Sequence, residues 1–206
     1  MAKNRFSHLK RKTGTREENK SILIVCGGEE TEPNYFKAFE TYSGCVIHVK
    51  KSHKGTSKLV EKALEFKNQN EYDSVWCVFD KDDFTDFDQA IDLANKHGIE
   101  VAYSNKCFEI WVLMHFGKSP KIHQKELEKE ADKSFKNTLK EKQGYSKNMD
   151  NLYMLLKSRQ KVAIEVATRC YADRELHGES PSTQVGVTTV HNLVNMLNEN
   201  SPNKWD

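Results

Sequence analysis

The sequence contains no apolar run that approaches the roughly 18 residues that a membrane-spanning helix requires. Its mean hydropathy of -0.77 and its 30% of charged residues favour a soluble protein. The first twenty residues are basic and have no apolar stretch behind them. We therefore expect no secretory signal, no membrane partner and a cytoplasmic location.

Cysteine pairs with metal-binding spacing are also missing. The five cysteines are odd in number and far apart in the chain, and we interpret them as small core residues in a reducing compartment. They are Cys26, Cys45, Cys77, Cys107 and Cys170.

The chain has little excess of either charge, with a formal net charge of +2, but its basic residues are clustered. Residues 1–20 hold seven Lys or Arg against two Glu, and a second cluster lies in "HVKKSHKGTSK". Such runs are often only solvated surface. Beside a separate acidic cluster they also suit a polyanion, so Lys50, Lys51 and Lys54 are candidate nucleic-acid contacts.

Strands and helices are predicted to alternate over the first half of the chain. Short apolar runs predict strands at 21–26, 45–49, 74–79 and 99–103. Helices are expected after Pro33, after Thr56 or Ser57, and after Thr85 or Asp86. This alternation is typical of an α/β fold with a mainly parallel central sheet and helices on both faces.

The pattern changes after residue 107. We favour a helix for "CFEIWVLMHF", and we expect a solvated helix with a sparse apolar stripe from residue 123, then helices at 149–170 and 187–199. The predicted organisation is a basic, flexible arm at 1–20, an α/β domain at 21–117 and a helical region at 118–206 packed on the sheet domain.

Carboxylates follow two of the predicted strands. Glu29, Glu30 and Glu32 come after the first strand, and Asp80, Asp82 and Asp83 come after the third. Ligands of open parallel sheets bind beyond the carboxyl ends of the strands. Like charges at that edge are costly without a cation, and Mg²⁺ or Mn²⁺ suits oxygen ligands of this kind. We interpret Glu30, Asp86 and Asp88 instead as helix caps or solvated turns.

An Asp-x-Asp spacing alone is a weak signal. Phosphatases that form an aspartyl phosphate and nucleotide-sugar transferases use the same spacing. An aspartyl-phosphate enzyme would carry the pair on its opening strand, whereas here Asp80 and Asp82 follow the third strand. A hydrolase with Asp80 as covalent nucleophile is therefore a third choice, which trapping with a phosphate analogue would reveal.

Several motifs in order resemble the RloB family of bacterial proteins and, more broadly, the Toprim domain. They are "ILIVCGGEETEPNYFKAF", "VWCVFDKDDF", "AYSNKCFEIWVLMHF" and "PSTQVG". The resemblance covers residues 20 to 198. It implies a Toprim-like, metal-dependent nuclease of restriction loci and abortive phage defence, with a partner ATPase encoded nearby. A homo-oligomer is compatible with it.

Carried over by position, the resemblance implies that Asp80 and Asp82 are metal ligands and that Asp83 assists them. It also implies a glutamate at the end of the first strand, where this chain has Gly27. A natural loss, an introduced change, or replacement by Glu29 or Glu32 would each account for this. Replacement is the least favoured of the three, because those side chains start several Å further along the turn. The resulting hypothesis is a nuclease fold with weak or absent activity.

Other candidates lie outside these two turns. Glu109 is a candidate ligand or base, or a helix-start carboxylate satisfied by backbone donors. His115 is a candidate proton donor or a satisfied core histidine. Lys147, Arg169 and Arg174 are candidate phosphate contacts or solvated cations. We expect residues 182–184 to open the last helix, as a cap or a phosphate site. The alternative function is a non-catalytic nucleic-acid-binding or protein-binding regulatory module on the same scaffold.

Overall fold

The computed structural model describes residues 20–42, 45–52, 55–119 and 124–202. Of the basic arm predicted at 1–20, residues 1–19 lie outside the described residues, as does Lys54, and Lys20 begins β1. The strands are β1 (Lys20–Cys26), β2 (Cys45–Lys51), β3 (Ser74–Asp80), β4 (Glu100–Asn105) and β5 (Val187–Thr188). The longer helices are α1 (Thr31–Lys37), α2 (Thr56–Gln69), α3 (Phe87–Lys96), α4 (Glu109–Met114), α5 (Gln124–Ser134), α6 (Leu152–Leu156), α7 (Gln160–Leu176) and α8 (Val190–Glu199).

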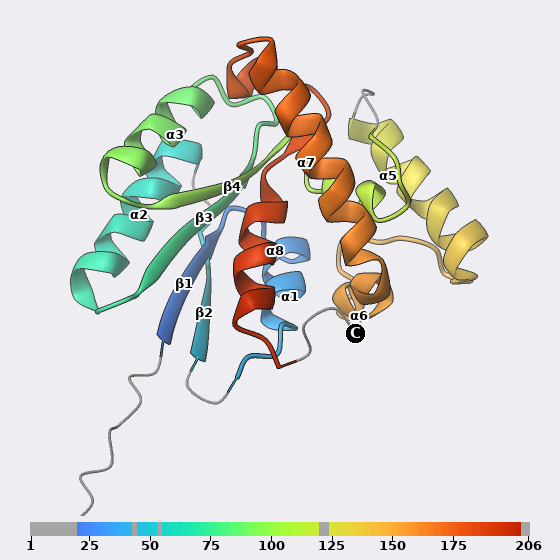
Figure 1. The fold of residues 1–206 in the computed structure, drawn as a ribbon, viewed down its shortest axis with the longest axis horizontal. Coiled ribbons are helices and arrows are strands. Elements are labelled where there is room, and N and C mark those ends of the chain that lie inside the picture. The colour runs from blue at the N-terminus through green and yellow to red at the C-terminus, as the bar shows by residue number, and fades with distance from the viewer. Residues whose placement is uncertain (1–19, 43–44, 53–54, 120–123, 203–206) are drawn as a thin grey trace, which may run out of the picture.

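The five strands form one sheet in the order β2-β1-β3-β4-β5. The first four strands are parallel, and β5 pairs with β4 in the antiparallel direction. The α/β class and the mainly parallel sheet are confirmed (Figure 1). Among the described helices none is both long enough and apolar enough to cross a bilayer.

Helices cover both faces of the sheet, and each face has its own core. On one face, α2 and α3 pack against alternate residues of the strands, including Leu23, Val25 and Cys77. On the other face, α1, α4 and the helices from α5 to α8 surround Ile22 and Ile24. Figure 1 shows α2 and α3 on one side of the strands and α8, α7 and α5 on the other. This two-sided burial explains why β1 is apolar throughout its centre.

The last part of the chain differs from its prediction. The segment predicted as one helix at 187–199 begins as strand β5, and residues 181–183 form a separate 3₁₀ turn that does not open α8. The amide of Gly186 donates to the carbonyl of Asn105 at 2.6 Å, and that of Thr189 donates to Tyr103 at 2.9 Å. These partners are some 80 residues away in sequence, so local periodicity does not indicate the strand.

The helical region also differs in detail. The predicted helix at 149–170 is divided into α6, a 3₁₀ turn at Lys157–Arg159 and α7. The solvated helix from residue 123 is present as α5, continued by a π-helical turn (Phe135–Leu139). Its apolar stripe buries Leu127, Ala131 and Phe135 in the core. The cysteines are free thiols, of which only Cys170 is partly exposed.

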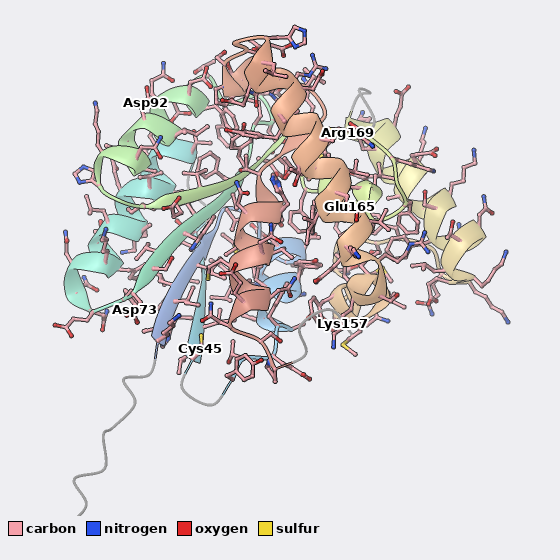
Figure 2. All side chains as sticks on the ribbon, viewed as in Figure 1. Cys45, Asp73, Asp92, Lys157, Glu165 and Arg169 are labelled. Atoms are coloured by element: carbon pink, nitrogen blue, oxygen red, sulfur yellow. The ribbon has the colours of Figure 1, made fainter. Side chains whose placement is uncertain are left out.

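The strand order places a topological switch point between β1 and β3. From β1 the chain crosses to β2 through α1 on one face, and from β2 it returns to β3 through α2 on the opposite face. Such switch points leave a crevice at the carboxyl ends of the two strands, where ligands bind. Figure 2 labels Cys45 and Asp73 at the opposite, amino ends of β2 and β3. The carboxyl ends of β1 and β3 therefore define the candidate site.

Candidate functional site

The backbone at the end of β1 is held by the neighbouring strand. The amide of Gly27 donates to the carbonyl of Val78 at 2.8 Å, which continues the pairing of β1 with β3 for one residue. A Cβ atom at Gly27 would lie 3.5 Å from the Cβ of Phe79 and 3.8 Å from the Cδ2 of Leu59. Both are ordinary van der Waals distances, so the fold has room for a side chain at this position.

Glu32 turns back toward the end of β1. It lies in the first turn of α1 and is only 6% exposed. A Cβ atom at Gly28 would collide with the Glu32 carboxylate. Burial raises the pKa of Glu32 to about 7, against the hydrogen bond that its carboxylate accepts from the backbone, and Glu109 and Asp82 add to the rise. Glu32 is thus a buried acid close to other acids.

We predict that Gly28→Ala destabilises the protein, because the Glu32 carboxylate must move to admit the new methyl group. The contacting atoms are the end of a side chain that can rotate, so we expect a cost near the low end of the roughly 1–3 kcal/mol that is typical of overpacking. Gly27→Ala is the matched control, since its Cβ would meet no close contact. Urea unfolding of the two variants measures the difference. Equal stability of both variants would show that the Glu32 carboxylate can move away from Gly28 without a loss of stability.

Asp80 ends β3 and points toward the same crevice. Its Oδ2 accepts a hydrogen bond from the amide of Phe108 at 3.1 Å, just before α4 begins. Burial raises the pKa of Asp80 well above its usual value, and the charges of Glu32, Asp82 and Glu109 raise it further. The first polar residue after the buried strand therefore meets three other carboxylates.

Asp82 does not continue the extended geometry that the sequence suggested. Its φ is 37°, in the left-handed region that Asp tolerates better than most residues, and its amide donates to the carbonyl of Lys106 at 3.1 Å. Its Oδ1 is buried and accepts no hydrogen bond. Burial raises the pKa of Asp82, and Lys147 opposes the rise. An acceptor oxygen without a donor is costly unless a ligand completes it.

Glu109 is the fourth carboxylate. It begins α4 and is 2% exposed. Its Oε1 accepts a hydrogen bond from the hydroxyl of Tyr145 at 3.0 Å and lies 3.6 Å from the Nζ of Lys147. Two side chains from the segment before α6 are therefore partners of this carboxylate.

Lys147 places a cation at the edge of the acidic cluster. Its Nζ also lies 2.9 Å from Oε1 of Glu128 on α5, and its carbonyl accepts a hydrogen bond from the hydroxyl of Thr31 at 2.6 Å. Burial opposes the charged form, but Glu128 and Glu109 outweigh it and hold the pKa of Lys147 above its usual value. The side chain is 48% exposed, so it can reach a ligand from solvent.

Two adjoining pockets of about 280 and 370 Å³ open over these groups. Residues common to both are Gly28, Glu29, Glu32, Asp80 and Asp82. The first pocket also has Glu109 and Lys147 in its wall, and the second has Gly27 and Phe84. Four partly or wholly buried carboxylates at one crevice favour a cation as ligand.

The carboxylates do not form a finished metal site. Over the described ranges, no three Asp, Glu, His or Cys side chains are arranged to hold a metal ion as they stand. The orphaned Oδ1 of Asp82 and the mutual repulsion at Asp80 nevertheless fit a hard divalent cation such as Mg²⁺, which needs only one or two carboxylates besides water and substrate. Asp80 and Asp82 are the residues that would hold it.

Most of the predicted site residues come together here. Gly27, Glu29, Asp80, Asp82, Glu109 and Lys147 line one pocket or both. Asp83 lines neither of them. Lys50 and Lys51 lie exposed at the end of β2, where Lys51 pairs with Cys26, and the Nζ of Lys50 lies 4.8 Å from the centre of the Phe66 ring.

His115 lies away from these pockets. It is fully buried in the core beside Trp111, and its Nδ1 is 2.9 Å from the carbonyl of that residue. Burial lowers the pKa of His115 to about 4, so its ring is neutral near pH 7. The structure does not bring His115 to the carboxylates.

Asp86, interpreted as a cap of its own helix, instead reaches the start of α2. It accepts hydrogen bonds from the hydroxyl of Thr56 at 2.5 Å and from the amide of Ser57 at 3.1 Å. Asp88 similarly accepts from the amide of Ser182 at 2.9 Å. Both carboxylates join separate elements, so neither is available as a ligand in the crevice.

Sequence reasoning underrated Glu32 and missed Tyr145. Glu32 was judged too far along the turn, but α1 begins at Thr31 and its first turn folds back over Gly28. The proline predicted a helix that begins at residue 33, but α1 begins two residues earlier, and Glu32 therefore lies inside its first turn. No local signal exists for Tyr145, because it meets Glu109 across 36 residues.

Comparison with protein-family models gives a match to one described as RloB-like protein, over residues 22–197. Neither the curated proteins nor the solved structures give a match.

Proposed function

Because the chain belongs to the RloB-like protein family, we propose that it is a metal-dependent phosphodiesterase of the Toprim type that acts on nucleic acid. The observation that supports this proposal is the crevice between β1 and β3, where Glu32, Asp80, Asp82 and Glu109 lie together with the ammonium group of Lys147. Bacterial phage defence, beside an ATPase partner, is the setting that the family resemblance suggests for it.

In this proposal Asp80 and Asp82 bind Mg²⁺ or Mn²⁺. The bound ion would supply positive charge at the scissile phosphate and make water a better nucleophile. Lys147 is half exposed at the same crevice, and its ammonium can neutralise a second phosphate oxygen as charge develops there. Tyr145 and Lys147 together hold Glu109 in place, so that its carboxylate can orient water or accept a proton.

In this proposal the basic end of β2 attracts the nucleic acid to the crevice. Lys51 pairs with Cys26, the last residue of β1, so Lys50 and Lys51 lie next to the crevice. Their charges attract phosphates from a distance without reading sequence.

The first test is a cleavage assay with labelled RNA and DNA in Mg²⁺ or Mn²⁺. We expect slow, metal-dependent cleavage by the natural chain, because no side chain is present at Gly27. Asp80→Asn and EDTA are each expected to abolish it. Product formation that Asp80→Asn leaves unchanged would overturn the proposal.

Metal binding is tested separately by thermal unfolding. A metal at 100 times its dissociation constant stabilises the folded state by about 2.7 kcal/mol. We expect Mn²⁺ to raise the melting temperature of the natural chain and to have little effect on Asp80→Asn. Glu30→Gln is the matched control, since Glu30 is an exposed acid of the same crevice.

A second candidate function is a non-catalytic nucleic-acid-binding or protein-binding module on the same scaffold. The specific observation that favours it is the glycine at position 27, which has no side chain to bind a metal or accept a proton. Metal binding and nucleic-acid binding without any product would support this candidate over the nuclease.

A further inference from the structure

The second pocket has an aromatic wall that the proposed chemistry does not use. Phe84 lies in the turn between β3 and α3 and is 40% exposed, one of few large apolar side chains at the surface of the described residues. Its ring packs on Gly55, where an added Cβ would lie 3.2 Å from the ring carbon Cε1. One edge of the ring therefore lies near the backbone of Gly55, and the side chain also lines the second pocket.

The turn that carries Phe84 is fixed at both ends. The amide of Phe84 donates to the carbonyl of Lys81 at 3.1 Å, and the Nζ of Lys81 donates to the carbonyl of Phe84 at 2.6 Å. Asp82, two residues earlier, faces the same pocket. The backbone of Phe84 is thus held at a set position relative to a carboxylate that we assign to metal binding, which lowers the entropy cost of ordering this turn around a ligand.

The pocket combines this ring with space and charge. Its volume of about 370 Å³ falls in the range of small-ligand sites. Gly27 and Gly55 contribute no side chains to its wall, whereas Glu32, Asp80 and Asp82 line it with carboxylates. One wall therefore suits a flat apolar group and another suits a metal-bound phosphate, which are the two ends of a nucleotide.

We propose that Phe84 stacks on an unpaired nucleobase next to the phosphate that is cleaved, and that the chain therefore prefers single-stranded nucleic acid. The inference rests on the proposed function, since the carboxylates fix where the phosphate lies. A base within a duplex has both faces covered by its neighbours and is not available to an aromatic ring. An unpaired base in RNA or DNA offers its face at no such cost.

If Phe84 stacks on one base, removal of that base should lower the affinity only when the Phe84 ring is present. Fluorescent oligonucleotides of about 12 nucleotides are prepared as RNA and as DNA, each with one abasic residue moved along the strand. Binding is followed by fluorescence anisotropy with Ca²⁺ as the divalent ion. We expect the natural chain to lose affinity roughly tenfold when the abasic residue reaches one position. Phe84→Ala should bind every oligonucleotide in the series with similar, reduced affinity.

Two control variants separate stacking from general effects. Phe84→Trp keeps an aromatic face and should retain the abasic position effect. Tyr42→Ala removes an aromatic side chain that is 48% exposed and outside both pockets, so it should behave as the natural chain. Urea unfolding of Phe84→Ala shows whether the turn still folds.

The outcomes separate this inference from the proposed function. Two results would overturn the inference alone. One is an effect of the abasic position that persists unchanged in Phe84→Ala. The other is a loss of affinity in this variant that is equal for single strands and for a duplex of the same sequence. Failure of the natural chain to bind any oligonucleotide would overturn both. The RNA and DNA series show which of the two sugars the stacked nucleotide carries.

Discussion

Gly27→Glu is expected to increase metal-dependent cleavage of nucleic acid by roughly 10²-fold or more, because a positioned acid or base contributes typically 10²–10⁴ in rate. The fold admits the change. A Cβ at position 27 meets only ordinary contacts, and the residue lines the pocket that also contains Asp80 and Asp82. The measurement is the initial rate on labelled RNA and DNA at several Mg²⁺ concentrations.

A second variant separates the effect of the new side chain's charge on the cleavage rate from the effect of its size. Gly27→Gln has nearly the same shape without the charge and should stay at the level of the natural chain. Adding Asp80→Asn to Gly27→Glu should abolish the gain, since both act through one ion. Equal, robust cleavage by the natural chain and by Gly27→Glu would contradict the prediction and would show that Glu32 or Glu29 already fills the role.

The second large effect is on the stability of the metal-free protein as pH changes. Burial holds the pKa of Glu32 at about 7 in the folded protein, against a usual value of 4.5. The folded state therefore binds more protons than the unfolded state between these two values. By linkage the free energy of unfolding falls as pH rises through this window, by about 3 kcal/mol for a shift of this size.

Glu32→Gln removes this titration while keeping the side chain's size. In EDTA we expect the variant and the natural chain to have similar stability near pH 4.5. Near pH 8 the variant should be the more stable of the two. Urea unfolding across the pH range measures this difference, and Glu30→Gln serves as the control on an exposed acid of the same turn. A difference between Glu32→Gln and the natural chain that does not change with pH would refute the assignment.

Urea unfolding in the presence of a divalent metal ion is an independent test of the same site. A divalent cation bound at Asp80 and Asp82 would offset the repulsion among the carboxylates, so saturating Mn²⁺ should restore much of the stability that the natural chain loses near pH 8. Glu32→Gln should gain less from Mn²⁺ than the natural chain does. If Mn²⁺ stabilises neither protein, the crevice does not bind the ion.

The frame of the fold was predictable because its signals are local. The apolar runs that became β1 to β4 are each short and bounded by polar turns, and alternation with helices requires parallel crossovers. Position in that frame also predicted that Asp80 and Asp82 would meet the turn after β1. The strand β5 was not predictable in this way, since its two residues become a strand only through pairing with β4.

The identity of the acids in the crevice needed the tertiary structure. Sequence spacing separates Glu109 and Tyr145 by 36 residues and Thr31 and Lys147 by 116, yet each pair is joined by a hydrogen bond. The first turn of α1 reverses the chain and brings Glu32 over Gly28, which distance along the sequence argued against. The position of the exposed Phe84 side chain beside the same carboxylates likewise depends on the tertiary structure.

Residue type and near neighbours were enough to predict the strands β1 to β4, the helices between them, the two acidic turns and the absence of a side chain at position 27. The sequence did not show which carboxylates lie together, that Lys147 lies beside them, or that the Phe84 ring lines the same crevice; these depend on the tertiary structure. Burial and charge repulsion depend on distances in space. Those distances are set by packing between elements that the chain brings together from far apart.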